Sequence, residues 1–183
     1  MKQSSLKNKI LHFVKKHDVV FMSFIFNSII LFIMLLFFEP TYFPYDDVAM
    51  CNLVDGSKGT YDPHLIFINC VIGYLLKWLY MTFSVVPWYT VLQYVIIFVS
   101  QMVLTHIMWR RMPAAYCRCA FLALLIFVSY HNYILLQFSR TATIATIAGV
   151  LALLNGFFEK KWSVKWLACG YLLALVGSWY RIM

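Results

Sequence analysis

Acidic residues are scarce in this sequence of 183 residues, which has seven Asp and Glu against 15 Lys and Arg. Only 12% of the residues are charged, about half the share that is usual in a soluble domain. Hydrophobic residues make up 63% of the chain, and the mean hydropathy is +0.77. A soluble fold of this length cannot bury so much apolar surface. The composition therefore predicts an all-α integral membrane protein with several spans.

Nucleic-acid-binding features are missing as well. The sequence has no Gly-rich phosphate loop and no basic run interleaved with aromatic residues in a polar context. The net charge of +8 is better explained by Lys and Arg that flank apolar spans on the cytoplasmic side. We therefore expect no nucleic-acid partner.

The five cysteines do not form a recognisable framework, because their number is odd and their spacing irregular. Cys117 and Cys119 lack the two-residue gap and the second pair of a zinc site. A disulfide between Cys51 and Cys70 stays open at this stage, since both could face an oxidising compartment.

The first long apolar run is Val19 to Phe38, about 20 uncharged residues, which is enough to span the hydrocarbon core. Glu39 and Pro40 follow it, where a secretory signal would have a small-residue cleavage site. We interpret the run as an uncleaved anchor. The preceding tail, residues 1–18, contains five lysines, which predicts a cytoplasmic N-terminus and places the next loop outside.

The segment 64–83 is ambiguous, because it is long enough to cross the membrane but contains Lys77. Asn69, Gly73, Lys77 and Ser84 fall on one helix face, so the segment either crosses the membrane or lies in the outer interface with that face toward water. The positive-inside rule favours the flat helix, because that topology places most Lys and Arg inside. The sequence then predicts five transmembrane helices, over residues 19–38, 88–109, 119–133, 141–158 and 166–180.

The predicted architecture is a single membrane domain, residues 19–183, with a long outer loop at 39–87 that carries the interfacial helix 64–83. Such a chain belongs in the cell (plasma) membrane as a multi-pass protein. We read its spans as nearly free of polar or charged residues. A small-residue face at Ala142, Ala145 and Ala148 indicates helix packing.

Five of the seven acidic residues lie in or beside the outer loop, and the sharpest feature there is the adjacent pair Asp46 and Asp47. Neighbouring carboxylates repel each other unless a metal, a cation or a proton offsets the repulsion. Two oxygen ligands suit Mg²⁺ or Mn²⁺. One carboxylate could instead act as a general base. The alternative is that both are solvated acids at the start of a short helix.

Other charged or polar residues are also predicted to lie on the outer side of the membrane. Asp62 and Pro63 look like the cap and first residue of a helix. Arg140 and Arg181 stand at predicted outer ends of spans, where they could bind a lipid phosphate or simply anchor the helix end among the headgroups.

The chain resembles the N-terminal part of GT-C-class membrane glycosyltransferases, and in particular multi-span proteins of bacterial surface-polysaccharide clusters. A basic tail leads to one span and then to an outer loop that begins with an Asp pair. The matching residues are Pro44 to Met50 (PYDDVAM), Gly56, Pro63-His64, Asn69, Gly73, Leu79-Tyr80, Pro87 to Tyr89, and Gln137 to Ala142.

The resemblance implies transfer of a sugar from a polyprenyl-phosphate donor to an acceptor on the outer membrane face. Asp46 and Asp47 would be catalytic or would hold a divalent cation, and Arg140 and Arg181 would contact the donor phosphate. The partners would be membrane lipid, the lipid-linked sugar and other polysaccharide-assembly proteins. Because such enzymes are much longer, we expect this chain to be a truncated form whose activity alone is in question.

Two other functions remain open. The chain could be a non-catalytic accessory protein that holds a polysaccharide-assembly complex together. It could also be a transporter of lipid-linked oligosaccharides, although such proteins usually carry polar or charged residues within their spans.

Overall fold

The computed structural model describes residues 2–42, 45–112, 114–159 and 163–181, with the backbone alone for 2–18. Pro44 of the Asp-pair motif and the basic residues Lys160 and Lys161 lie outside the described residues. The described part is all-helical apart from one short strand pair. Its elements are α1 (Lys2–Phe37), β1 (Thr41–Tyr42), α2 (Tyr45–Val54), α3 (Cys70–Thr82), α4 (Trp88–Arg111), α5 (Ala115–Tyr133), β2 (Leu135–Leu136), α6 (Phe138–Phe157) and α7 (Val164–Tyr180).

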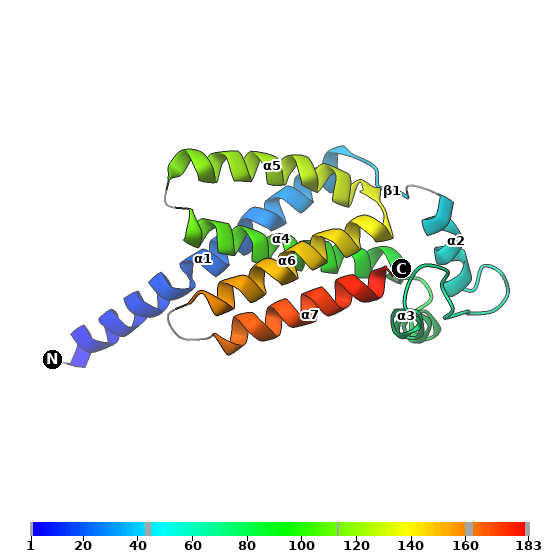
Figure 1. Ribbon diagram of the computed structural model, residues 1–183, viewed down its shortest axis with the longest axis horizontal. Coiled ribbons are helices and arrows are strands. Elements are labelled where there is room, and N and C mark those ends of the chain that lie inside the picture. Colours follow the sequence, from blue (N-terminus) through cyan, green and yellow to red (C-terminus); the bar gives the residue numbers. More distant parts are fainter. Residues whose placement is uncertain (1, 43–44, 113, 160–162, 182–183) are drawn as a thin grey trace.

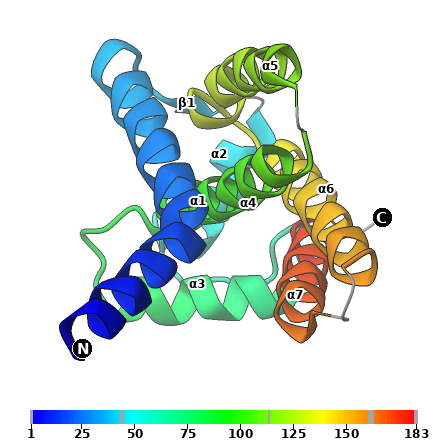
Figure 2. The same ribbon diagram turned by 90° about the vertical axis from the view of Figure 1, so that its left-hand side faces the viewer.

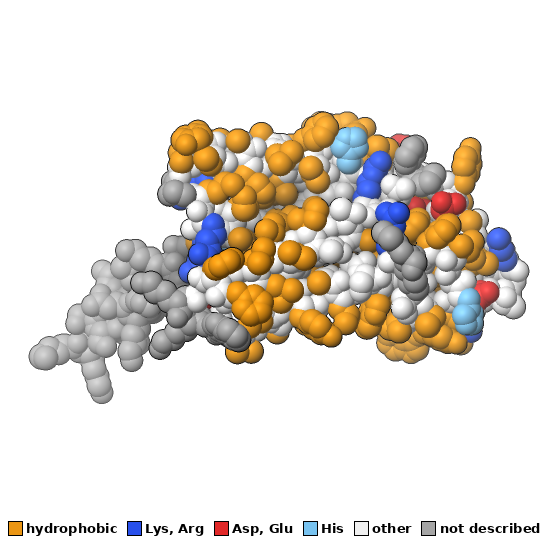
Figure 3. Space-filling view, viewed as in Figure 1, with side chains coloured by type: hydrophobic (Ala, Val, Ile, Leu, Met, Phe, Trp, Pro, Cys, Tyr) orange, Lys and Arg blue, Asp and Glu red, His pale blue; other side chains and the backbone are white. Residues whose placement is uncertain are grey.

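Three stretches of helix in the described residues are long and apolar enough to cross a membrane: Val19–Phe37, Trp88–Arg111 and Phe138–Phe157. They run side by side with α5 and α7 in one elongated bundle (Figure 1). Hydrophobic side chains cover the side of the bundle in Figure 3, as expected for a surface in contact with lipid. These features are compatible with an all-α membrane protein, and the number of spans stays a prediction.

The helices α6 and α7 pack closest, because glycines let their backbones approach. A Cβ atom added to Gly149 would lie 2.5 Å from the backbone nitrogen of Ala174, and one added to Gly170 would lie 2.6 Å from that of Leu153. Ala145 and Ala148 are fully buried. This is the small-residue packing by which helices associate in a membrane.

Uncharged polar residues occupy the bundle interior, which the sequence reading of nearly apolar spans did not anticipate. The Asn27 amide donates to the Thr105 hydroxyl at 3.1 Å and ties α1 to α4. The Ser129 hydroxyl donates to Gln101 Oε1 at 3.1 Å and ties α5 to α4. These side chains find partners because a polar group facing lipid would be left without one.

One end of the bundle is covered by α2, α3 and the loop between them. The helix α3 appears end-on in Figure 1 and crosswise in Figure 2, so it lies across the bundle direction. An apolar cluster joins this cap to the bundle; its members include Met50, Val54, Ile68, Leu76, Tyr80, Tyr89 and Tyr180. We call this the acidic end, because Asp46, Asp47, Asp55 and Asp62 lie there.

The expected helix 64–83 is shorter than predicted and begins at Cys70. Its cap is Asn69, whose side chain accepts from the Val71 amide at 3.0 Å. Asp62, the predicted cap, instead accepts from the backbone amide of His64 at 2.9 Å. Pro63 packs over the helix: a Cβ on Gly73 would lie 1.8 Å from its carbonyl oxygen. The preceding residues therefore run irregularly.

The orientation of this helix also differs from the prediction. Gly73, placed on the water-facing side by the sequence reading, is buried together with Ile72, Leu76 and Tyr80. The exposed face is apolar and consists of Val71, Tyr74, Leu75, Trp78 and Met81. Such a face suits contact with acyl chains or headgroups.

All five cysteines are described and are free thiols, so no bridge joins Cys51 to Cys70. The strands β1 and β2 pair in parallel, with Thr41 opposite Leu135 and Tyr42 opposite Leu136. This pairing was not predicted. It holds the start of the outer loop against the α5–α6 connection and so sets where α2 begins.

Candidate functional site

The two adjacent carboxylates of α2 have opposite surroundings. Asp46 is exposed, whereas Asp47 is fully buried. Successive residues of an α-helix point about 100° apart, so only one of the pair can face the bundle. The sequence reading treated the two as one site, and the structure separates them into an accessible acid and a buried acid.

Asp47 is held by three hydrogen bonds to a single oxygen atom. Its Oδ1 accepts from the Tyr89 hydroxyl at 2.8 Å, from the Phe138 backbone amide at 3.0 Å and from the Gln93 amide at 3.4 Å. Phe138 is the first residue of α6, where free backbone amides favour a negative charge. The carboxylate therefore joins α2 to α4 and α6.

Further hydrogen bonds hold the residues that donate to Asp47. Gln93 accepts through Oε1 from the Thr141 hydroxyl at 2.9 Å, which fixes the direction of its amide. The Tyr80 hydroxyl accepts from the Tyr89 backbone amide at 3.0 Å. The network thus connects α3 and the first turns of α4 and α6.

The other oxygen of the buried acid is unusual. Asp47 Oδ2 is buried and has no hydrogen-bond partner in the described part of the chain, and the buried hydroxyl of Tyr180 has none either. Burial raises the pKa of Asp47 to about 6, although the bonds from Tyr89 and Phe138 oppose the rise. The carboxylate is therefore mostly ionised at pH 7 and is close to its titration range.

The tyrosines around the acid belong to the same end of the protein. The Tyr42 and Thr90 hydroxyls form a hydrogen bond, which ties β1 to α4. Burial raises the pKa of Tyr80 to about 12 and that of Tyr42 further, so both stay protonated. They act as neutral hydrogen-bonding groups and not as charges.

The predicted phosphate ligands, Arg140 and Arg181, both lie at the acidic end. Arg140, in the first turn of α6, donates to the carbonyl oxygens of His131 at 3.1 Å and Leu135 at 3.0 Å. It also borders a small hollow with Asn132 and Ser139. Arg181 follows α7 and is exposed.

A metal ion would find few protein ligands here. Among the described residues, no group of three or more His, Cys, Asp or Glu side chains could hold one. Asp46 is exposed and could supply one oxygen, while the accepting oxygen of Asp47 is already occupied by three donors. The remaining ligands of Mg²⁺ or Mn²⁺ would come from water and from substrate, as is usual for Mg²⁺.

Sequence reasoning did not find Tyr89, Gln93, Thr141 or Tyr180 as members of this site. Tyr89 was singled out only as part of the motif Pro87 to Tyr89. Gln93 could have been found from the sequence, because a polar side chain within an apolar span is a candidate functional residue. It lies one helical turn after Tyr89, so the two share a helix face.

Comparison with protein families, with curated proteins and with solved structures gives no match. The function must therefore be argued from the geometry of the acidic end.

Proposed function

We propose that this chain acts in sugar transfer at the outer membrane face, in the manner of a GT-C-class glycosyltransferase that uses a polyprenyl-phosphate donor. The observation that carries the proposal is the divided acid pair. An exposed carboxylate, Asp46, stands beside a buried one, Asp47, which is fastened to α4 and α6. An accessible acid on a rigidly held helix start is the arrangement that a catalytic carboxylate requires.

In this proposal Asp46 is the general base. It accepts the proton of an acceptor hydroxyl while that oxygen forms a bond to the anomeric carbon of the sugar. The bond from the anomeric carbon to the donor phosphate breaks on the opposite face, and the polyprenyl phosphate leaves with the electron pair. In the alternative role, Asp46 would hold a divalent cation that stabilises the charge of that phosphate.

Asp47 is a positioning residue in this scheme. Its bonds to Tyr89 and Phe138 fix the first turn of α2 and hence the direction of Asp46. Arg140 and Arg181 lie at the same end and could neutralise the donor phosphate. The apolar exposed face of α3, with Trp78 and Met81, offers a place for the lipid chain of the donor.

The test compares Asp46→Asn with Asp47→Asn in membranes that contain a polyprenyl-phosphate sugar, with Glu39→Gln as the matched control. Glu39 is an exposed acid of the same loop. We expect Asp46→Asn to lower transfer about a hundredfold or more, as for loss of a general base, without changing thermal stability. Transfer by Asp46→Asn equal to that by Glu39→Gln would overturn the proposal.

The second candidate is a non-catalytic membrane protein of a polysaccharide-assembly complex. Full burial of Asp47 and its role as a junction of three helices favour this reading, because a structural acid needs no access to substrate. It predicts that Asp46→Asn is silent in every assay, while Asp47→Asn destabilises the chain and releases its partners.

A further inference from the structure

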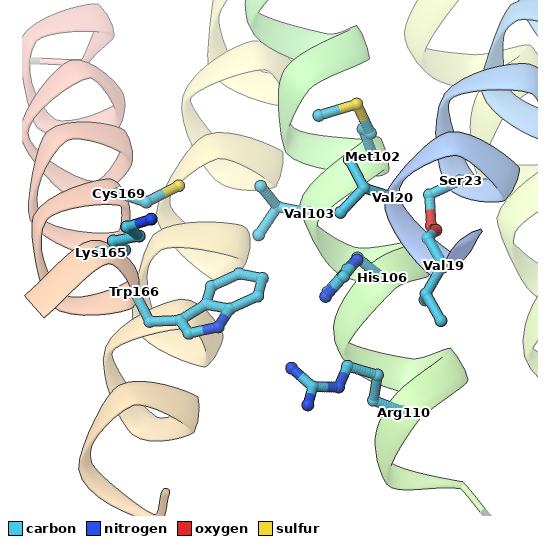
Figure 4. A pocket seen from close by; sticks show the side chains of 10 residues that line it. All are labelled: Val19, Val20, Ser23, Met102, Val103, His106, Arg110, Lys165, Trp166 and Cys169. Atoms are coloured by element: carbon cyan, nitrogen blue, oxygen red, sulfur yellow. The ribbon is translucent and has the colours of Figure 1, made fainter. Parts of the chain in front are cut away.

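A cavity lies at the end of the bundle opposite the acidic end, between α1, α4 and α7. It has a volume of about 530 Å³, and its lining includes Ser23, His106, Arg110, Lys165 and Trp166. Figure 4 shows side chains from the three helices directed toward this space. The positive-inside pattern predicts that this end is cytoplasmic.

Two cations border the cavity, Arg110 near the end of α4 and Lys165 in the first turn of α7. Arg110 also pairs with Glu159, with 3.5 Å between Nη1 and Oε1, and its side chain remains 53% exposed. Among the side chains that the structure describes here, two cations stand against one carboxylate, which favours an anion at this mouth.

The buried side chain of His106 indicates a ligand on grounds other than charge. His106 is 8% exposed, and its Nδ1 is buried with no hydrogen-bond partner in the described part of the chain. Its ring lies against Trp166, with 5.1 Å between ring centroids, and points across the cavity (Figure 4). A polar atom in such a position is expected to have a partner.

A separate apolar hollow of about 490 Å³ lies farther along the seam between α1 and α4. It is lined by Phe24, Ser28, Leu35, Val95 and Phe98, among others. On α4, the residues Val95, Val99, Met102, His106 and Arg110 follow at helical spacing, so both hollows open along one face of this helix. A charged cavity and an apolar hollow therefore follow one another along the same face of α4.

We propose that this seam binds an anionic glycerophospholipid of the adjoining leaflet. Its phosphate lies among Arg110, Lys165 and His106, and an acyl chain lies along the α1–α4 groove. Basic pockets between membrane helices are suited to such headgroups. The site is separate from the proposed sugar-transfer site, so either proposal can fail without the other.

The experiment measures lipid retention by the full-length protein in detergent, by native mass spectrometry. The probe is dioleoyl phosphatidylglycerol, with dioleoyl phosphatidylcholine and inorganic phosphate as comparisons. We expect one phosphatidylglycerol to be retained per chain. Arg110→Gln and Lys165→Gln should each weaken retention about tenfold, as for loss of one charge-assisted contact. Lys58→Gln, an exposed cation of the outer loop, is the matched control.

A cavity-filling change tests the space inside the cavity separately from its charges. Val20→Trp should block retention, because Val20 lines the cavity, while Val48→Trp on α2 should not. Melting temperature should rise with added phosphatidylglycerol in the wild type and in Lys58→Gln, and less in Lys165→Gln. Equal retention of phosphatidylcholine, equal competition by inorganic phosphate, or unchanged retention by Lys165→Gln would each overturn the proposal. Lys165 is exposed, so its replacement should leave folding intact.

Discussion

Replacing Asp47 should destabilise the protein far more than replacing its neighbour. In Asp47→Ala the Tyr89 hydroxyl and the Phe138 amide lose their shared acceptor while they remain buried. An unsatisfied buried donor costs about 1–3 kcal/mol, so the two together predict a loss of about 2–6 kcal/mol in the free energy of unfolding.

Asp47→Asn should be milder, because the amide keeps one acceptor oxygen. It loses the charge that favours the α6 start. Its amino group takes the place of Oδ2, for which the described residues offer no hydrogen-bond partner. We expect a loss of about 1–3 kcal/mol. Asp46→Ala removes only an exposed acid from a helix start, which is worth less than about 1 kcal/mol.

The assay is denaturant unfolding of the full-length protein in detergent micelles, followed by the fluorescence of its six tryptophans. The expected order of stability is wild type, Asp46→Ala, Asp47→Asn, Asp47→Ala. If Asp47→Ala unfolds at the same denaturant concentration as Asp46→Ala, then the three bonds do not hold the acidic end together and the account of the site is wrong.

Three further predictions follow from other features. The pKa of Asp47 is raised from 3.8 to about 6, so the folded state binds a proton at this carboxylate more readily than the unfolded state does. The free energy of unfolding should therefore increase as pH falls from about 6 to 4. Asp47→Asn should lack that increase when its unfolding is compared with that of the wild type over this pH range. Gly170→Leu should disrupt the α6–α7 contact and lower the melting temperature, whereas Ser178→Leu on the exposed side of α7 should not. Single cysteines at positions 58 and 111, in a background without the native five, should be labelled from opposite sides of the membrane; labelling from one side would show that α3 crosses it.

The long helices were predictable because their signal is local. Apolar runs indicated 88–109 and 141–158, and the observed helices are Trp88–Arg111 and Phe138–Phe157. The start of α3 was not predictable in the same way. Pro63 looked like a first helical residue, but its carbonyl packs against Gly73, ten positions later in the chain, and the local pattern gives no sign of that contact.

The candidate site was predictable only in part, because its contacts join residues that are far apart in the sequence. The sequence singled out the acid pair, yet it could not say which carboxylate faces inward. That choice depends on Tyr89, Gln93 and Phe138, which lie 42, 46 and 91 positions from Asp47. The β1–β2 pairing brings the outer loop to the start of α6, and two-residue strands leave no pattern in the sequence.

Burial of Asp47 is compatible with catalysis and with a structural role. Both readings require this carboxylate to hold α2 against α4 and α6, so both predict that its replacement is harmful. The exposed neighbour is different, since Asp46 contributes little to packing and its replacement should cost less than about 1 kcal/mol of stability. A variant that keeps the fold and loses sugar transfer must therefore be made at Asp46. Effects at Asp47 become interpretable once the stability of its variants is known.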